Sequence, residues 1–283
     1  MPKRQFGVST HLYHSQQLSR DHLLEIAAHG FEAVEVFATR THFDYHNPNA
    51  VADLQQWLAE AGLVLSSVHA PITESYTGGR WGRSLSVASP DESERLAAVA
   101  ETERSMHIAR RIPVPVLVLH LGVPRTQEAP GGNNTRAAAR RSVEDLQRAA
   151  QPLGVKIAVE VLPNEISGAG SLTHFVEHDL EGVDAGICLD FGHAHMDGDV
   201  VDAIEAVSEH LVATHIHDNH GRSDEHLVPF DGTIDWAAAL TAVQKVGYDG
   251  TFLLELAAHG SPRETLKKAQ KARERMERML ATD

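Results

Sequence analysis

The segment 214–226, THIHDNHGRSDEH, is dense in side chains that can bind a metal ion. Within it lie four histidines and three acids: His215, His217, His220, His226, Asp218, Asp224 and Glu225. Imidazole nitrogens and carboxylate oxygens are common ligands of zinc and of other transition metals. Taken alone, the segment fits a solvated polar loop equally well. Its place in the fold must decide between the two interpretations.

Side chains of the same kinds stand at the ends of several short apolar runs. They are His69 in SSVHAP, His120 in VLVLHLG, Glu160 in AVEVLP, Asp190 and His193 in CLDFGHAH, and Glu255 in FLLELA. Burying an unpaired carboxylate costs several kcal/mol. No Lys or Arg adjoins Glu160 or Glu255 in the sequence, so each needs a cation or a metal ion brought to it by the fold. Glu35, inside another apolar run, has the same need.

The elements that would position these residues alternate between strand and helix. Short apolar runs predict strands at 5–9, 32–38, 63–69, 115–121, 156–162, 185–190, 212–217 and 251–256. Amphipathic stretches predict helices at 20–29, 48–61, 91–111, 135–151, 171–181, 199–211, 235–246 and 262–280. Apolar strands separated by helices are typical of parallel strands that are buried on both faces.

Eight strand–helix units without a dividing linker predict one α/β domain, a (β/α)8 TIM barrel over residues 1–283. A doubly wound open sheet is the alternative, but it needs a glycine-rich phosphate turn after the first strand. The sequence there, GVSTHLYHS, contains no such turn. Active sites of (β/α)8 barrels form at the C-terminal ends of the strands. We therefore expect the candidate ligands to meet at one rim, with segment 214–226 as one wall of a metal site.

The predicted ligand set combines imidazole and carboxylate groups and contains no thiolate. Such a set suits Zn, Mn, Co or Fe, with Mg possible where carboxylates dominate. The candidates exceed what one ion uses, so we predict one to three divalent ions bound by His69, His120, Glu160, Asp190, His193, His215, Asp224, His226 and Glu255. Loop 71–88, which contains Trp81, is either a flap over this site or an ordinary surface loop. His11 and His14 either line the site or are structural.

The composition limits the classes of function. The chain has 42% hydrophobic residues, one cysteine (Cys188) and no apolar run typical of a signal peptide or a membrane span. We expect a soluble cytoplasmic protein with no internal disulfide and no membrane partner. The formal net charge of −14 argues against a nucleic-acid partner. A homo-oligomer stays open.

An ordered series of motifs resembles the xylose isomerase-like TIM-barrel superfamily. The motifs are HAP at 69–71, HLG at 120–122, VEV at 159–161, LDFGHAH at 189–195, HIHDN at 215–219, DEHLVPFDGTIDW at 224–236 and LLEL at 253–256. Within the superfamily the chain is most similar to the sugar phosphate isomerase/epimerase family, and the resemblance covers nearly its whole length. The motifs are specific to the superfamily and do not define a substrate.

The resemblance to ketose 3-epimerases implies one ion held by Glu160, Asp190, His215 and Glu255. The two glutamates would form the acid/base pair, and His193 would contact substrate. Arg222 is displaced by one residue from the position of an arginine in that branch. His69 and Glu35 are further candidates for substrate contact. The implied function is a metal-dependent isomerase or epimerase that moves a proton beside the carbonyl of a sugar, sugar phosphate or keto-polyol.

The resemblance to endonuclease IV implies an alternative, because that branch binds three zinc ions through nine ligands and all nine positions are matched here. The alternative function is a metal-dependent phosphoesterase with a di- or trinuclear zinc site. The scattered arginines give little support for DNA as its substrate. A barrel that binds metal without catalysis is a third hypothesis, which the intact pair of glutamates disfavours.

Overall fold

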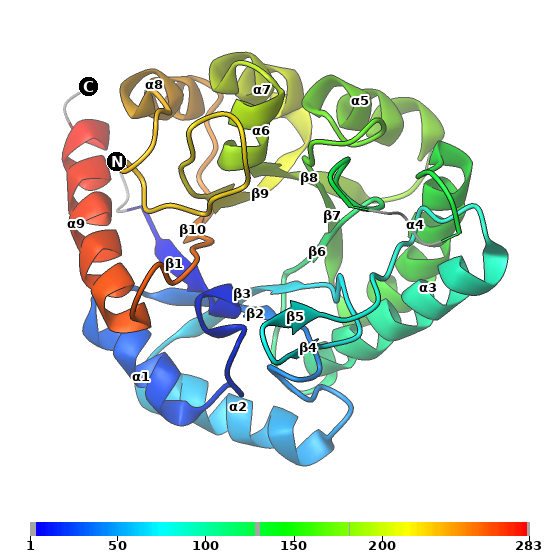
Figure 1. Ribbon diagram of the computed structural model, residues 1–283, viewed down its shortest axis with the longest axis horizontal. Helices are drawn as coiled ribbons and strands as arrows, with labels where there is room; N and C mark the ends of the chain where they lie inside the picture. Colours follow the sequence, from blue (N-terminus) through cyan, green and yellow to red (C-terminus); the bar gives the residue numbers. More distant parts are fainter. Residues whose placement is uncertain (1–3, 128–130, 181, 282–283) are drawn as a thin grey trace.

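The computed structural model describes residues 4–127, 131–180 and 182–281. Eight parallel strands form a closed barrel in the order β1, β10, β9, β8, β7, β6, β3, β2 (Figure 1). The strands are β1 (Phe6–Ser9), β2 (Ala33–Phe37), β3 (Val64–His69), β6 (Val116–Leu119), β7 (Lys156–Glu160), β8 (Ala185–Asp190), β9 (Leu211–Ile216) and β10 (Phe252–Leu254). The predicted (β/α)8 barrel is confirmed, and every predicted strand overlaps an observed one.

A ring of helices surrounds the barrel (Figure 1). The α-helices are α1 (Arg20–Ala28), α2 (Pro48–Ala61), α3 (Glu92–Met106), α4 (Arg136–Ala150), α5 (Ala169–His174), α6 (Phe191–Asp197), α7 (Val200–Val207), α8 (Trp236–Lys245) and α9 (Pro262–Leu280). Shorter turns are η1 (Thr10–Tyr13), η2 (His107–Arg110), η3 (Gln151–Leu153), η4 (Phe175–Asp179) and η5 (Ser208–His210). The predicted helix 171–181 ends on Glu181, and the predicted domain ends on residues 1 and 283, which lie outside the described residues.

The barrel closes where β1 pairs with both β10 and β2. The register at the closure sets Phe6 opposite Phe252 and Val8 opposite Leu254. Every residue of β1, β2, β8 and β10 is buried, as expected for parallel strands covered by helices on the outside and by one another inside. The apolar runs of the sequence therefore form the barrel wall.

The C-terminal ends of the parallel strands share one rim. His69, Glu160 and Asp190 are the last residues of β3, β7 and β8. Glu255 directly follows β10, and His120 directly follows β6. The rim is thus the place where the candidate ligands converge.

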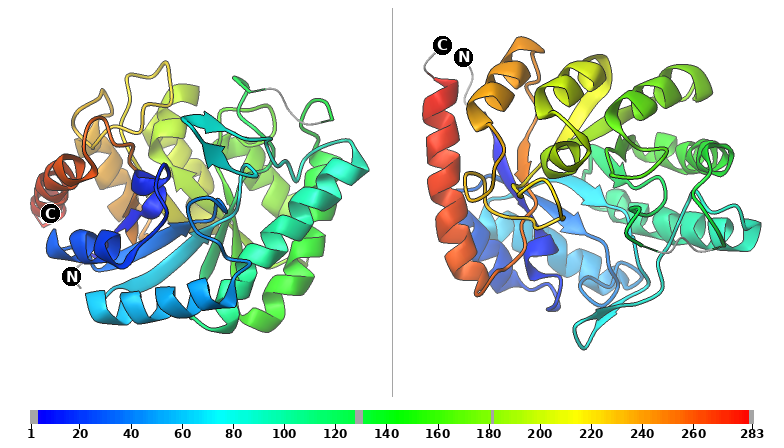
Figure 2. Two further views of the ribbon diagram at one scale, coloured as in Figure 1. Left: turned by 60° about the horizontal axis from the view of Figure 1, so that its bottom comes forward. Right: turned by 45° about the horizontal axis from the view of Figure 1, so that its top comes forward.

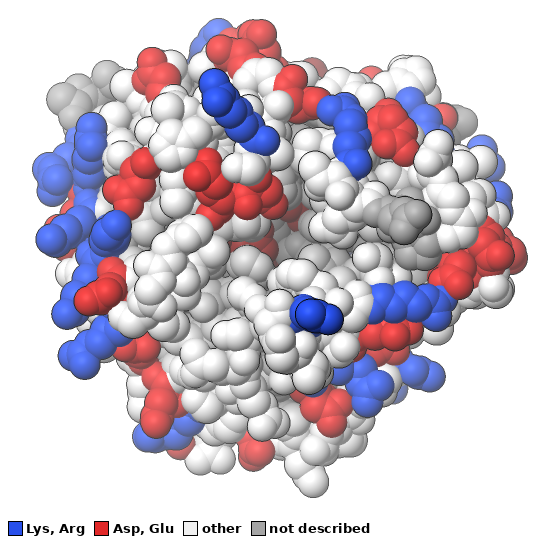
Figure 3. Space-filling model, in the orientation of Figure 1, with Lys and Arg blue, Asp and Glu red and all other residues white. Residues whose placement is uncertain are grey.

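A small antiparallel hairpin of β4 (Tyr76–Thr77) and β5 (Arg80–Trp81) stands on the same side of the barrel as the loop after β9 (Figure 2). The centre of this face is hollowed, and acidic side chains line part of the hollow (Figure 3). None of the described helices is both long enough and apolar enough to cross a membrane.

Candidate metal centre

Four buried side chains at the rim form what we call the carboxylate cluster: Glu160, Asp190, His215 and Glu255. His215 Nδ1 lies 3.3 Å from Glu160 Oε1, 3.4 Å from Glu255 Oε2 and 4.0 Å from Asp190 Oδ2. The four donors come from β7, β8, β9 and the end of β10, so the closed barrel alone brings them together. One nitrogen and three carboxylates make a ligand set that suits Zn, Mn or Co.

A second group, the histidine cluster, consists of His193, His217, Asp224 and His226. Asp224 Oδ2 lies 3.2 Å from His193 Nε2 and 3.1 Å from His226 Nε2. The His217 and His226 rings stack with their centroids 4.1 Å apart, and His217 Nε2 is 3.6 Å from Asp224 Oδ1. His217 Nε2 is also 3.0 Å from Asp190 Oδ1, so the two clusters are continuous.

His69 and His120 extend the centre on the other side of Glu160. Their Nε2 atoms lie 3.3 Å and 3.1 Å from Glu160 Oε2. Neither contact has hydrogen-bond geometry, so this buried oxygen lacks a hydrogen-bond donor, as does Asp190 Oδ2. Two ligand atoms bound at about 2.1 Å to one tetrahedral ion stand about 3.4 Å apart. The spacing and the unpartnered oxygens therefore fit ligands of a metal ion.

Each of three histidines has its Nδ1 atom occupied outside the clusters. The Nδ1 atoms of His69, His193 and His226 lie 2.8 Å, 3.0 Å and 3.0 Å from the carbonyl oxygens of Ala70, Val161 and Glu255. Because a carbonyl oxygen only accepts hydrogen bonds, each Nδ1 carries the proton and donates it. Each Nε2 atom then faces the centre. Such outer partners fix the tautomer and the orientation of ligand histidines.

Glu35 on β2 holds His215 in the same way. Its Oε2 lies 3.1 Å from His215 Nε2 and accepts a hydrogen bond of 2.7 Å from Ser67 Oγ. Glu35 is fully buried. It therefore orients the His215 ring, with Nδ1 toward the carboxylate cluster, and does not reach the open cavity.

The loop after β9 is shaped so that Asp224 and His226 turn inward. Buried Asp218 organises it, because its carboxylate accepts hydrogen bonds from the Phe230 backbone amide and the Trp236 indole, among others. His226 has a φ of 46°, a backbone conformation that is costly for a residue with a side chain and that clusters at functional sites.

Gly192, in the FGHAH sequence of α6, makes room for the His217 ring. A Cβ atom at this position would lie 1.9 Å from His217 Cε1. Only glycine lets the start of α6 approach the histidine cluster this closely. Asp190 caps the same helix by accepting from the His193 backbone amide at 2.7 Å, which places His193 over Glu160.

In the centre, burial and neighbouring charges shift the pKa values of the side chains in opposite directions. Burial raises the pKa of Glu160, but His120 and His215 outweigh it and hold that pKa well below its ordinary range. Burial lowers the pKa of His69, whereas the carboxylates of Glu160, Glu255 and Glu35 raise it to about 9. The pKa of His226 also rises to about 9 against burial, because Asp224 lies beside it. Among the described residues, the histidines of the centre thus carry the positive charge that offsets its buried carboxylates.

A narrow cavity of about 80 Å³ opens onto the clusters. Its polar wall is formed by His11, His69, His120, His193, Asp224, His226 and Glu255, and apolar residues such as Phe37, Ile72 and Leu85 form the other wall. Among the described residues no Lys or Arg lines it. Arg222 is exposed on the loop after β9 and does not line the cavity, and Glu160 lies beneath it.

The structure brings together all nine predicted ligands, and it adds His217, which is not among them. The signal was available, because His215 and His217 are two residues apart and point to the same side where a strand continues. His11 stands beside the centre, with its ring centroid 4.9 Å from that of His226.

Comparison with known proteins gives a consistent picture. Residues 23–281 match the family described as xylose isomerase-like TIM barrel. The uncharacterized protein MJ1311 of Methanocaldococcus jannaschii is 28% identical over 263 residues, which cover 88% of this chain and 83% of that protein. L-ribulose-5-phosphate 3-epimerase UlaE of Escherichia coli is 27% identical over 180 residues, 62% of this chain and 61% of the enzyme.

Solved structures share the whole architecture. The crystal structure of a D-tagatose 3-epimerase-like protein has a TM-score of 0.77 at 24% identity, with 98% of this chain and 97% of that chain covered. The IolI protein, solved with a binding zinc atom, has a TM-score of 0.73 at 18% identity, with 99% and 100% covered. At these identities the structural likeness establishes the fold alone.

Proposed function

The chain belongs to the xylose isomerase-like TIM barrel family, and from this premise we propose that it is a metal-dependent isomerase or epimerase of sugars. Its reaction would move a proton at the carbon beside the carbonyl of a small sugar, sugar phosphate or keto-polyol. The observation that carries the proposal is the carboxylate cluster, in which Glu160 and Glu255 flank His215 Nδ1 at 3.3 Å and 3.4 Å. The relative that is an L-ribulose-5-phosphate 3-epimerase supports the same class of reaction.

The residues of the centre fit a divalent ion, because buried carboxylate oxygens of Glu160 and Asp190 lack hydrogen-bond donors. The carboxylate cluster would hold the first ion, and the histidine cluster offers ligands for a second. Zn, Mn or Co suit these donors, and Mg suits the carboxylates. A bound ion would supply Lewis acidity at the substrate carbonyl.

The two glutamates divide the proton transfer between them. Glu255 lines the cavity and can remove a proton from, or return it to, a substrate carbon held there. Glu160 lies deeper, enclosed by His69 and His120, so a substrate that engages it must replace these contacts. The Nε2 atoms of His69 and His193 point inward and can orient substrate hydroxyls.

The test replaces each glutamate by glutamine, which keeps an oxygen and removes the titrating group. We expect Glu160→Gln and Glu255→Gln each to lower turnover by about a hundredfold or more, the usual scale of acid/base catalysis. Metal content, measured by inductively coupled plasma analysis, should be retained, at least in Glu255→Gln. Solvent deuterium should enter the wild-type product at the carbon beside the carbonyl. Turnover without this exchange would refute proton transfer through solvent-exchangeable glutamates.

A multinuclear phosphoesterase is the second candidate, and the histidine cluster favours it because it could hold a further ion beside the first. The absence of Lys and Arg from the described cavity wall gives a phosphodiester backbone no cationic partner there. Assays with a phosphodiester and with abasic DNA separate the candidates, since cleavage would replace the isomerase proposal. A purified protein that contains no metal and gains no activity when metal is added would favour a non-catalytic role.

A further inference from the structure

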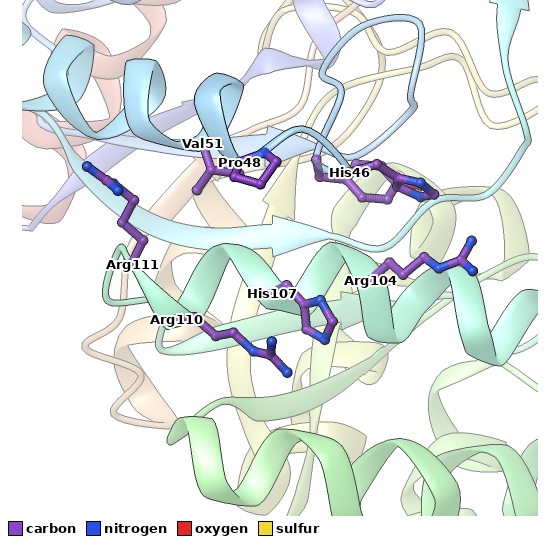
Figure 4. Close-up of a pocket in the computed structure, with 8 residues that line it drawn as sticks. His46, Pro48, Val51, Arg104, His107, Arg110 and Arg111 are labelled. Atoms are coloured by element: carbon purple, nitrogen blue, oxygen red, sulfur yellow. The ribbon is translucent and has the colours of Figure 1, made fainter.

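A second concave surface lies outside the barrel, between α2 and α3, and takes no part in the centre described above. It is a groove of about 490 Å³ that we call the α2–α3 groove. Figure 4 shows Pro48 and Val51 at α2 on one side and Arg104, His107 and Arg110 at α3 and η2 on the other. Its volume falls in the range of about 300–1,000 Å³ that is typical of small-molecule sites.

The groove is strongly cationic on a chain whose net charge is −14. Arg104, Arg110 and Arg111 line it together with His46 and His107, and no described Asp or Glu does. Glu101, an acid beside this wall, is already shared, since its Oε1 accepts from Tyr45 Oη at 2.6 Å and lies 2.8 Å from His46 Nε2. Its Oε2 accepts from Arg104 at 3.2 Å.

Two arginines keep their charge available. No carboxylate among the described residues forms an ion pair with Arg110 or Arg111, although most other arginines of the chain have one. Arg111 is held across the groove, because its Nε donates to Gln55 Oε1 of α2 at 2.8 Å. Gln55 Nε2 in turn donates to the Arg111 carbonyl at 3.2 Å. The guanidinium is thus positioned by a neutral partner and not neutralised by an acid.

The pKa of His107 reflects the excess of positive charge in the groove. Partial burial lowers its pKa, and the neighbouring charge of Arg110, together with that of Arg104, lowers it further against the opposing effect of Glu103. An anion bound between these side chains would act in the opposite direction and raise the pKa of His107. Pro48 and Val51, with the ring of Tyr45, give the same groove an apolar wall.

We propose that the α2–α3 groove binds a small organic phosphate monoester. A guanidinium group donates paired, charge-assisted hydrogen bonds to phosphate oxygens, a role that fits Arg110 beside His107, while Arg111 adds positive charge on the α2 side of the groove (Figure 4). The apolar wall suits the uncharged part of such a molecule, which inorganic phosphate lacks. A long nucleic acid is disfavoured, because the rest of the chain is acidic and would repel it. The proposal is independent of the sugar isomerase proposal, since none of the residues that line the groove lines the cavity.

The test uses the full-length, metal-loaded protein with AMP as the probe. We expect one AMP to bind per groove by calorimetry, more tightly than adenosine or inorganic phosphate, and the NMR titration midpoint of His107 to move to higher pH. Arg110→Gln and Arg111→Gln should each weaken AMP binding by about tenfold or more, the scale of a lost hydrogen bond to a charged group. The matched control Arg263→Gln, an exposed arginine at the start of α9, should bind AMP as the wild type does.

Three outcomes would overturn the proposal. They are AMP binding no tighter than adenosine, unchanged AMP affinity in both arginine variants, and a His107 midpoint that does not move at saturating AMP. Tighter binding of a single-stranded oligonucleotide than of AMP would replace the proposal with a nucleic-acid surface. His107→Glu provides a second variant at an exposed position; it should stay folded by circular dichroism and should abolish AMP binding.

Discussion

Asp224 is the residue that links the histidines of the histidine cluster to one another. Its two oxygens lie 3.1 Å to 3.6 Å from the Nε2 atoms of His193, His217 and His226. Three imidazoles around one carboxylate, with the ring protons of His193 and His226 directed to backbone carbonyls, make up the ligand set that we propose for a second ion. The cluster therefore accounts for the nitrogen-rich half of the centre.

Replacing Asp224 by alanine should lower the metal content at saturation by about one ion per chain. The reason is that Asp224 is the carboxylate that contacts every histidine of its cluster, whereas the carboxylate cluster keeps all four members. Inductively coupled plasma analysis after dialysis against zinc measures the loss, and circular dichroism checks that the barrel stays folded. The matched control Asp231→Ala removes an acid from the same loop that pairs with Lys268 outside the centre.

His226→Ala should give the same loss of metal. If both variants keep the metal content and the thermal stability of the wild type, the segment 214–226 is only a polar loop.

At the level of single residues the sequence was informative wherever a polar side chain ended an apolar run. Glu160 and Glu255 stood out because burial of a carboxylate needs compensation, and both lie in the centre. His217 also ends a predicted strand, but its contact with Asp190 joins two strands that lie apart in the sequence, and the sequence alone did not single it out. The role of Glu35 could not be deduced either, because its contact with His215 spans 180 residues of sequence.

Among the elements, the β4–β5 hairpin has the clearest consequence for access to the centre. Trp81 on the hairpin stacks on His14 with centroids 5.0 Å apart and meets Tyr76 at 4.6 Å. Ile72 and Leu85, at the two ends of the hairpin segment, line the cavity. The cavity of about 80 Å³ is far below the roughly 300 Å³ of an ordinary small-molecule site. We therefore predict that the hairpin moves when a substrate enters.

Trp81→Ala should loosen the hairpin and raise the KM for substrate by about two- to tenfold, the scale of a lost aromatic pair. Metal content should not change, because Trp81 contacts none of the proposed ligands. Limited trypsin digestion after Arg80 should become faster in the variant. The control Leu96→Ala removes another exposed hydrophobic side chain, on α3, and should leave both measurements unaltered. Equal KM and equal digestion in Trp81→Ala and the wild type would make the segment an ordinary surface loop.

The strands were predictable because buried parallel strands are largely apolar, and each predicted run overlaps an observed strand. Helix α6 was not predicted, since its seven residues, FGHAHMD, are too few to show a helical period. Tertiary contacts stabilise it instead, through the Asp190 cap and the close approach of Gly192 to His217. The hairpin likewise has two-residue strands that no pattern reveals.

For the molecule as a whole, the histidines of the centre make the free energy of unfolding depend on pH once metal has been removed. His69 and His226 each have a pKa of about 9 in the fold, above the value of 6.5 for a free imidazole. A raised folded pKa means that protonation favours the native state. The contribution is complete below pH 6.5 and is lost as the pH rises through 9.

We therefore expect the Tm of the chelator-treated protein to fall between pH 6.5 and pH 9, as measured by differential scanning calorimetry. The fall should be smaller in His69→Gln, and it should stay the same in His178→Gln, a histidine exposed on η4. Zinc should reverse the trend, because metal ligands bind better when they are deprotonated. A Tm of the metal-free protein that is flat or rises over this interval would contradict the assigned ion pairs.

The closure of β1 against β10 also has a consequence during synthesis on the ribosome. Phe6 of β1 cannot pair with Phe252 of β10 until β10 has been synthesised. One edge of the nascent sheet therefore stays open until β10 has emerged. Glu255 follows the same last strand, and until it arrives the carboxylate cluster has only three of its four members. Barrel closure and completion of the ligand set are thus a single late event. A chain stalled before residue 252 would expose an unpaired strand edge and would be a target for chaperones and proteases.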